Sequence, residues 1–222
     1  LVKSHEDRYH LAVTAHHILM DGWSMPLLMQ DLMALYVLRG DRAALPPTRS
    51  YADFLAWLEE QDHAASLERW AEAMGGISEP TIVAPVQRDA DNDTMSKMSV
   101  LVDTDRTARL TALATESGVT VNTLVQAAWG VLLGRITGRA DVVFGATVSG
   151  RPADLPGVET MVGLFINTLP VRVRIHPDEP VVQMRRRVQA ERADLPDHPC
   201  LGLSVIEQRI GTPIGFDSLL VF

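Results

Sequence analysis

Cysteine is almost absent from this sequence, which excludes one class of protein. The 222 residues contain a single cysteine, Cys200, so no disulfide can form within the chain and a disulfide-stapled fold is ruled out. A lone thiol is most often a small buried side chain. We expect a protein of a reducing compartment, the cytoplasm.

Long apolar runs and excess positive charge are also missing. The longest apolar runs are far shorter than the roughly 20 residues that cross a bilayer, and no secretory leader is recognisable, so we expect no membrane partner. The net charge of −8 and the pI near 5.3 argue against a nucleic-acid partner. With 46% hydrophobic and 22% charged residues, the composition is typical of a soluble globular protein of one or two domains.

The sequence lacks a recognisable metal-binding pattern. His5 and His10 stand at no known ligand spacing, and no Cys or His cluster would complete a site around them. Asp89, Asp91 and Asp93 alternate, but a calcium loop also needs a glycine and a later glutamate at fixed positions. We therefore expect no metal, nucleotide or redox cofactor bound directly to the chain.

Apolar residues recur with helical and strand periods in turn, which predicts an α/β layered fold. Strands are expected at 8–15, 98–102, 141–149, 168–175 and 216–222, and helices at 24–39, 50–74 (one or two), 105–117, 120–137, 180–195 and 201–209. Pro170 has no backbone donor and predicts an edge strand or a bulge. The stretch 75–97, with glycines, prolines and a polar run, is the best candidate for a link between two parts.

One stretch combines residue types that few soluble folds need together: His16-His17-Ile18-Leu19-Met20-Asp21-Gly22. It follows the predicted strand 8–15, and the end of a strand is a usual place for chemistry. Neighbouring side chains on a strand point to opposite faces, so we expect the two histidines to have different roles. The pair could be buried core residues, metal ligands with Asp21, or exposed loop residues. An imidazole, with its pKa near neutrality, suits a proton acceptor for an amine.

Residues 16–24 (HHILMDGWS) resemble the HHxxxDG motif of condensation domains of nonribosomal peptide synthetases, which have the chloramphenicol-acetyltransferase-like fold. Further stretches resemble blocks of this family in the family's order: 51–57 (YADFLAW), 143–152 (VFGATVSGRP), 162–172 (VGLFINTLPVR), 197–208 and 216–222. Together they cover nearly the whole chain. The resemblance implies a two-lobed α/β fold, of which this chain holds the end of the N-terminal lobe and much of the C-terminal lobe.

The resemblance also implies a division of the chain. Residues 1–80 would belong to the N-terminal lobe with the HHxxxDG motif, 81–97 would link the lobes, and 98–222 would form part of the C-terminal lobe. Two earlier family motifs are not found, so we expect the chain to be a piece of a larger domain.

Members of the family join two acyl groups that are held as thioesters on phosphopantetheine arms of carrier domains. The amine of the acceptor attacks the thioester carbonyl of the donor, in a tunnel between the lobes. The resemblance therefore implies donor and acceptor peptidyl carrier domains, a neighbouring adenylation domain and the remainder of the condensation domain as partners.

The family's residue roles carry over to matching positions. His17, the second histidine, would take the amine proton or hold the amine by a hydrogen bond, whereas His16 would be structural. Asp21 would shape the loop through an ion pair with an arginine, for which Arg151 is the first choice and Arg172 the alternative.

The remaining motif residues would support the reaction. Gly22 would leave backbone room and offer its N–H to the thioester oxygen. Asn167 and Ser24 are candidates for the tunnel lining, with a structural role as the alternative for both. Ser24 could also cap the helix that follows.

Other functions of the same fold stay open at this point. An epimerisation domain shares HHxxxDG, and a catalytically silent module would bind partners without making bonds. Within the condensation domains, the residues of 149–152, 156–174 and 201–203 resemble the subtype that accepts a D-configured donor. The run Arg185-Arg186-Arg187 is expected to be a solvated face, with carrier docking as the alternative.

Overall fold

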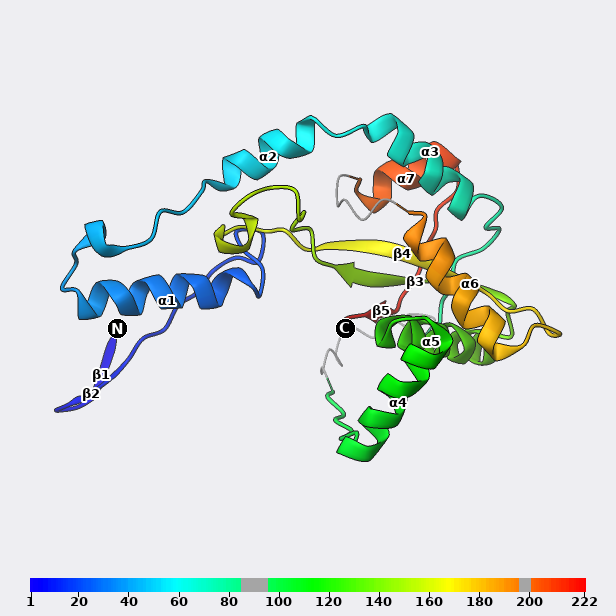
Figure 1. Cartoon of the computed structure of the whole chain (residues 1–222), viewed down its shortest axis with the longest axis horizontal. Coiled ribbons are helices and arrows are strands. Elements are labelled where there is room, and N and C mark those ends of the chain that lie inside the picture. Colours follow the sequence, from blue (N-terminus) through cyan, green and yellow to red (C-terminus); the bar gives the residue numbers. More distant parts are fainter. Residues whose placement is uncertain (85–95, 196–200) are drawn as a thin grey trace. The chain divides into compact units, whose positions relative to one another are not determined.

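The computed structural model describes residues 1–84, 96–195 and 201–222 (Figure 1). The chain forms two compact units. The first joins Leu1–Gln61 with Ser149–Ile166, and the second joins Asp62–Val148 with Asn167–Phe222. The lobe boundaries at 80 and 97 stay a prediction, and Asp89, Asp91, Asp93 and Cys200 lie outside the described residues.

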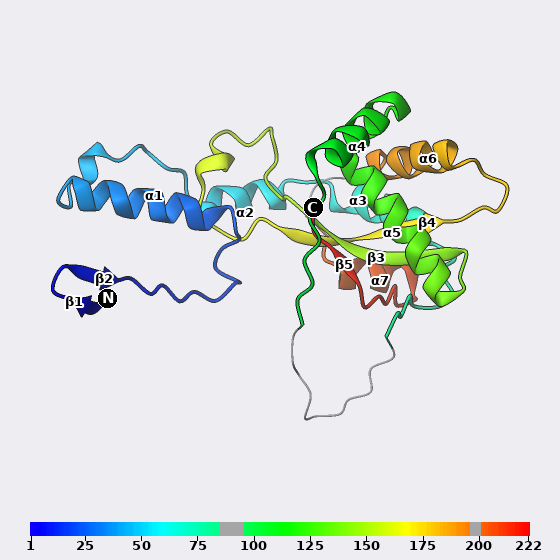
Figure 2. The ribbon, with the colours of Figure 1, turned by 90° about the horizontal axis from the view of Figure 1, so that it is seen from below.

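The first unit begins with a hairpin of β1 (Val2–His5) and β2 (Arg8–His10), visible beside the N-terminus in Figure 2. The strand predicted at 8–15 is therefore too long. Residues 11–16 have no regular structure and are exposed. A strand persists only while a neighbour accepts its hydrogen bonds, and among the described residues β1 pairs with Arg8–His10 alone. The alternation argument consequently does not apply to His16 and His17.

Helix α1 (Ser24–Val37) follows the HHxxxDG motif and begins without the predicted serine cap. Trp23 stands at the N-cap position, and the Asp21 side chain accepts the Ser24 N–H instead. The apolar side chains of α1 are at most half-buried within this unit, and Tyr36 is 81% exposed. The predicted 24–39 helix is confirmed apart from its last two residues.

A small aromatic core holds the rest of the first unit together. Phe54 of α2 (Tyr51–Glu59) packs against Phe165, with ring centroids 4.6 Å apart. Leu155, Val158 and Met161 complete the buried cluster, around the short 3₁₀ helix Val158–Thr160. A second 3₁₀ helix spans Arg42–Ala44. Segment 149–166 is thereby packed onto α2, although nearly a hundred residues separate them in sequence.

The second unit is a layered α/β structure. Its elements are α3 (His63–Met74), α4 (Thr104–Ser117), α5 (Val121–Thr137), β3 (Asp141–Val148), β4 (Asn167–Arg174), α6 (Val181–Ala193), α7 (Leu203–Ile210) and β5 (Leu219–Leu220). Alternate residues of β3 enter two cores. Val143 joins residues of α3 and α7, while Phe144 joins residues of α5 and α6. Helices thus cover both faces of the sheet, which confirms the predicted fold class.

The sheet has the order β4-β3-β5 among the described strands. β3 and β4 pair antiparallel over eight residues, and β5 adds to β3 in parallel. Pro170 lies opposite Gly145, whose N–H donates to Ser218 on the β5 side. Pro170 therefore occupies the edge strand, as its missing donor predicted.

Helix ends follow the predicted capping residues in this unit. Gly118 and Gly138 end α4 and α5 with φ of 69° and 70°, a left-handed conformation that glycine adopts without a side-chain clash. Thr120 caps α5 by accepting the Thr123 N–H. The predicted 50–74 stretch forms two helices, α2 and α3, and Ser50 caps the first.

One strand prediction in this unit is wrong, and another is too long. Residues 98–102 have no regular structure and no strand partner within the described chain, with Met98 88% and Leu101 92% exposed. Apolar composition alone cannot make a strand without a neighbour to bond. The last strand, expected over 216–222, is confirmed at Leu219–Leu220, and Phe216 forms an isolated bridge with Thr81.

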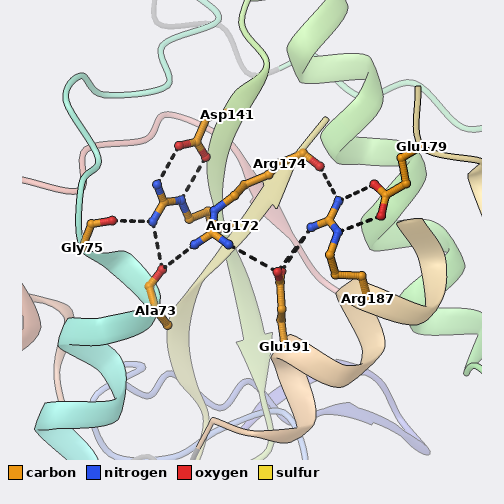
Figure 3. A network of polar contacts seen from close by, with 8 residues as sticks. All are labelled: Ala73, Gly75, Asp141, Arg172, Arg174, Glu179, Arg187 and Glu191. Carbon is orange, nitrogen blue, oxygen red and sulfur yellow. Dashed lines mark hydrogen bonds and ion pairs between the residues drawn. The ribbon is translucent and has the colours of Figure 1, made fainter. Parts of the chain in front are cut away.

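Of the three consecutive arginines in α6, only Arg186 is exposed, so the predicted solvated face holds for one residue of the run. Arg185 is buried, and Arg187 pairs with Glu179 at 2.7 Å and with Glu191 at 3.3 Å (Figure 3). The Arg186 guanidinium donates to the Ser117 carbonyl at the end of α4. The partners of Arg187 lie only four and eight residues away in sequence, whereas Ser117, the partner of Arg186, is 69 residues away and could not be inferred from the run itself.

Within the described ranges, no single helix is long and apolar enough to cross a membrane. The pair α4 and α5 passes that length and composition test only when joined across a 96° bend. No group of three or more potential metal ligands occurs among these same residues.

Candidate functional site

The two histidines occupy an exposed turn of the first unit. The Leu19 N–H donates to the His16 carbonyl at 3.0 Å, and the Ile18 N–H donates to Nδ1 of His16 at 3.1 Å. The His16 ring thus binds the backbone of its own turn. The His17 ring is exposed and has no hydrogen bond to the described residues. The hypotheses of a buried core pair and of metal ligands with Asp21 are therefore wrong for this structure.

Asp21 anchors the turn from inside, with its side chain 1% exposed. Oδ1 accepts from the Ser24 N–H at 2.9 Å and lies 2.8 Å from Ser24 Oγ. Oδ2 accepts from the Phe165 N–H at 3.1 Å, and the Asp21 N–H donates to the Gly163 carbonyl at 3.1 Å. The carboxylate therefore fastens the motif to a segment about 140 residues away.

Ser24 is the centre of this cluster, because its hydroxyl touches four polar groups. Oγ accepts from the Gly163 N–H at 3.0 Å and from Nη2 of Arg151 at 3.2 Å. Its single proton can be donated either to Asp21 Oδ1 or to the Gly163 carbonyl, both at 2.8 Å. A hydroxyl has one donor and two acceptor sites, so this one is fully used and is 0% exposed.

Arg151 supplies the positive charge, as the resemblance implied. Its Nη2 lies 3.6 Å from Asp21 Oδ1, and its side chain is 8% exposed. Nη1 donates to the carbonyls of Val158 and Met161. The guanidinium carbon lies 3.8 Å from the centre of the Phe165 ring, a cation–π contact. Arg172, the alternative partner, lies in the second unit and pairs with Asp141.

The environment of Asp21 keeps it ionised. Burial alone would raise the pKa of this carboxyl, but the hydrogen bonds from Ser24 and Phe165 and the charge of Arg151 outweigh burial, so the pKa lies below its usual value. Burial lowers the pKa of Arg151, against the opposing charge of Asp21. The pair is therefore an ionised pair whose carboxylate oxygens are satisfied mainly by neutral donors.

Gly22 and Trp23 form the outer side of the turn. A Cβ placed on Gly22 would meet no atom within 4 Å, so the space beside this glycine is open in the first unit. The Trp23 indole is exposed, but its Nε1 donates to the Glu159 carbonyl at 3.0 Å. The turn consequently presents His17, the Gly22 backbone and one face of an indole to the outside.

Asn167 has a structural contact in the second unit. Its Nδ2 donates to the Leu201 carbonyl at 3.2 Å, and its Oδ1 accepts the Thr168 N–H at 2.8 Å. The side chain thereby joins the start of β4 to the segment before α7. This is the structural alternative that the sequence left open, and a tunnel-lining role stays a prediction.

Tyr51 and Gly163 are the partners that sequence reasoning missed. The Tyr51 hydroxyl donates to the Leu164 carbonyl at 2.5 Å, and a Cβ on Gly163 would lie 2.1 Å from the Tyr51 ring. Both residues stand in the blocks 51–57 and 162–172, which marked them only as parts of a resemblance. A tyrosine and a glycine in separate blocks give no signal that they touch.

Comparison with known proteins adds a family to this geometry. The condensation domain family model matches residues 1–221. The chain is 42% identical over 222 residues to one of the linear gramicidin synthase proteins of Brevibacillus parabrevis, covering 96% of this chain and 4% of that protein. It is 35% identical over 226 residues to surfactin synthase subunit 3 of Bacillus subtilis (strain 168), covering 100% of this chain and 18% of that protein.

Solved structures agree on the fold. The first condensation domain of the calcium-dependent antibiotic synthetase, in complex with a substrate analogue, matches with a TM-score of 0.66 at 24% identity, over 90% of this chain and 45% of that one. The X-domain from teicoplanin biosynthesis matches with a TM-score of 0.64 at 27% identity, over 89% and 47%. The chain thus spans less than half of these structures and less than a fifth of the two synthase proteins. On the family match and the ordered motif blocks, the chain belongs to the condensation domain family of nonribosomal peptide synthetases.

Proposed function

We propose that this chain is part of a condensation domain that forms an amide bond between two carrier-bound substrates. The donor is an aminoacyl or peptidyl thioester and the acceptor an aminoacyl thioester, each on the phosphopantetheine arm of a carrier domain. The observation that carries the proposal is the ring of His17, which is exposed and has no hydrogen bond to any described residue, on a turn that a buried ionised cluster holds in place.

The reaction needs little from the protein besides orientation and proton handling. The acceptor amine attacks the carbonyl carbon of the donor thioester, an N–C bond forms, and the C–S bond breaks to release the donor arm as a thiol. One proton must leave the nitrogen and one must reach the sulfur. His17 takes the amine proton or holds the amine by a hydrogen bond. Positioning alone can contribute several kcal/mol, so both roles are compatible with the exposed ring.

The other motif residues support this turn. Asp21 and Arg151 hold the loop and do not touch the substrate, and the His16 ring stiffens the turn through its bond to Ile18. The open space at Gly22 supports a role for its N–H in polarising the thioester oxygen. Because Ser24 is fully buried and fully bonded, it supports the turn rather than lining a tunnel.

The proposal includes partners and a larger domain. Donor and acceptor carrier domains bring the substrates, an adenylation domain loads the acceptor carrier, and the remainder of the condensation domain completes the tunnel. The lobes, with residues 1–80 and 98–222 on either side of a link at 81–97, are part of this proposal. Membership of the family and the lengths of the related synthetases support it.

The test uses the complete domain, meaning this chain extended to the full length of its family, with loaded donor and acceptor carriers. Mass spectrometry of the acceptor carrier follows amide formation for the wild type, His17→Ala and His10→Ala. We expect His17→Ala to lower the rate about a hundredfold, the effect of losing a positioned acid–base group. His10 is an exposed histidine of β2 outside the motif, so His10→Ala is the matched control and should keep the wild-type rate.

Other outcomes would identify the alternatives. An unchanged rate in His17→Ala would remove His17 from the chemistry. Binding of loaded carriers without any amide product would favour the partner-binding module, and inversion of the donor without condensation would favour an epimerisation domain. Donors of L and D configuration, compared in the same assay, test the D-donor subtype.

A further inference from the structure

One three-residue segment of the first unit, Gly163–Phe165, forms several hydrogen bonds with Asp21 and Ser24 of the HHxxxDG turn. We call it the support segment. Its Gly163 N–H and carbonyl bond to Ser24 and Asp21, and its Phe165 N–H bonds to Asp21. Backbone groups that are fixed in this way cannot shift without breaking bonds to the turn. The support segment and the HHxxxDG turn therefore move together.

Tyr51 contacts the same support segment through its hydroxyl and through its ring. It is the first residue of α2, and its hydroxyl donates to the Leu164 carbonyl, the one carbonyl between the two groups that Asp21 binds. Its ring lies edge-on to the Phe165 ring, with centroids 5.1 Å apart and planes at 88°. Both the hydroxyl and the ring of Tyr51 therefore contact the support segment.

The fit of Tyr51 to the backbone is close enough to exclude other residues at its partner position. At Gly163, a Cβ would lie 2.1 to 2.7 Å from three atoms of the Tyr51 ring, distances that no real side chain tolerates. Removing the ring would leave a void against the backbone, and adding a side chain at Gly163 would push the ring away. The tyrosine ring thus sets where the support segment runs.

Electrostatics keep the tyrosine in its donor form. Burial raises the pKa of Tyr51, and the negative charge of Asp21 raises it further. The hydroxyl therefore stays protonated and continues to donate to Leu164 across the working range of pH.

We propose that Tyr51 is a positioning residue for His17, acting through the backbone of the support segment. The path runs from the Tyr51 hydroxyl to the Leu164 carbonyl, then through the adjoining peptide groups to the Asp21 side chain and N–H, and so to the turn that carries His17. Tyr51 does not touch the substrate in this proposal. The proposal rests on the proposed function, in which His17 acts on the acceptor amine.

The test is Tyr51→Phe in the complete domain, because this change removes the hydroxyl and keeps the ring. Tyr36→Phe, at an exposed position of α1, is the matched control. We expect Tyr51→Phe to lower kcat about tenfold with little change in KM for the loaded acceptor carrier, since a displaced catalytic group affects the chemical step. Tyr36→Phe should keep the wild-type rate.

A double mutant separates positioning from general stability. In a His17→Ala background, Tyr51→Phe should have no further effect on the residual rate, because the group that it positions is gone. A merely structural role would lower the rate by the same factor in both backgrounds, and that result would overturn the proposal.

A second readout does not depend on activity. The ring Cε1–H resonance of His17, identified by its loss in His17→Ala, should shift or broaden in Tyr51→Phe and stay unchanged in Tyr36→Phe. If the wild type makes no amide but this resonance responds, the proposed function fails while the positioning contact stands. An unmoved resonance in Tyr51→Phe would overturn the positioning role whatever the activity.

Discussion

Two polar clusters, one in each unit, hold their surroundings by different means. In the first unit, Asp21, Ser24 and Arg151 form a cluster in which the carboxylate is buried and its charged partner is the most distant contact, at 3.6 Å. In the second unit, an arginine network links Arg172 to Asp141, Arg174 to Glu191, and Arg187 to both Glu179 and Glu191 (Figure 3). There the ion pairs are as short as 2.7 Å, and Asp141 is 39% exposed.

The difference predicts how much stability each cluster loses when one of its residues is replaced. A carboxylate that loses its partner beside water regains hydration, so the cost is modest. A buried carboxylate has no such replacement, and losing a partner leaves an uncompensated charge. The Asp21 cluster should therefore respond to single changes much more strongly than the arginine network, although its ion pair is longer.

The largest effect is expected for Arg151→Met in the complete domain. This change leaves Asp21 buried without a cation and frees the carbonyls of Val158 and Met161. We expect a loss of about 3–5 kcal/mol in the free energy of unfolding, measured by urea titration. A loss no greater than that of Arg172→Met would contradict the comparison.

The next effect concerns Asp21→Asn and its dependence on pH. The folded-state pKa of Asp21 is depressed, so its ionised form contributes stability that is complete above about pH 5 and is lost as the pH falls through the folded pKa. We expect the mutant to be less stable than the wild type by about 1–3 kcal/mol near neutrality. Urea titrations at several pH values should show this gap closing towards acid, and a gap independent of pH would mean that Asp21 is not ionised.

Arg172→Met should cost less, about 1–2 kcal/mol. The guanidinium donates to the Ala73 and Gly75 carbonyls at the end of α3, and these contacts vanish, but Asp141 can return to water. Urea unfolding measures this loss, with Arg69→Met on the exposed face of α3 as a control for the arginine stem. A cost equal to that of Arg151→Met would show that exposure of the carboxylate does not decide the outcome.

The smallest effect is expected at the exposed pair of Arg209 and Glu68, which joins α7 to α3. The Arg209 guanidinium makes bonds of 2.7–3.0 Å to Glu68, yet both side chains are largely in solvent. Glu68→Gln should cost about 0.2–1 kcal/mol. The effect should shrink at 1 M salt, where screening is strong, whereas the effect of Arg151→Met should persist.

The sequence predicted elements better than contacts. Helices with clear caps, such as α4 and α5, and the buried strand β3 were predicted because their signals are local. The strand expected over 8–15 is confirmed only at Arg8–His10, and the one expected over 98–102 is wrong, because a strand depends on a neighbour that the local sequence does not contain. These segments do contain the apolar residues typical of strands, but such residues do not show whether a neighbouring strand is present.

The candidate site divides in the same way. The Asp21–Arg151 ion pair followed from a motif resemblance that named both residues. The roles of Ser24, Tyr51 and Gly163 did not follow, because their contacts use backbone N–H and carbonyl groups, which every residue carries. Only the fold brings these groups within hydrogen-bonding distance of each other.

The proline in β4 has a consequence for how this protein behaves at high concentration. An exposed strand edge can template association with another chain through its unpaired N–H and carbonyl groups. On the open side of β4, the Thr168 N–H is already bonded to Asn167, Pro170 has no N–H, and the Arg174 carbonyl accepts from Arg187. Along this edge of the described sheet, a foreign strand would therefore lack two donors and one acceptor of the ladder, which disfavours pairing there.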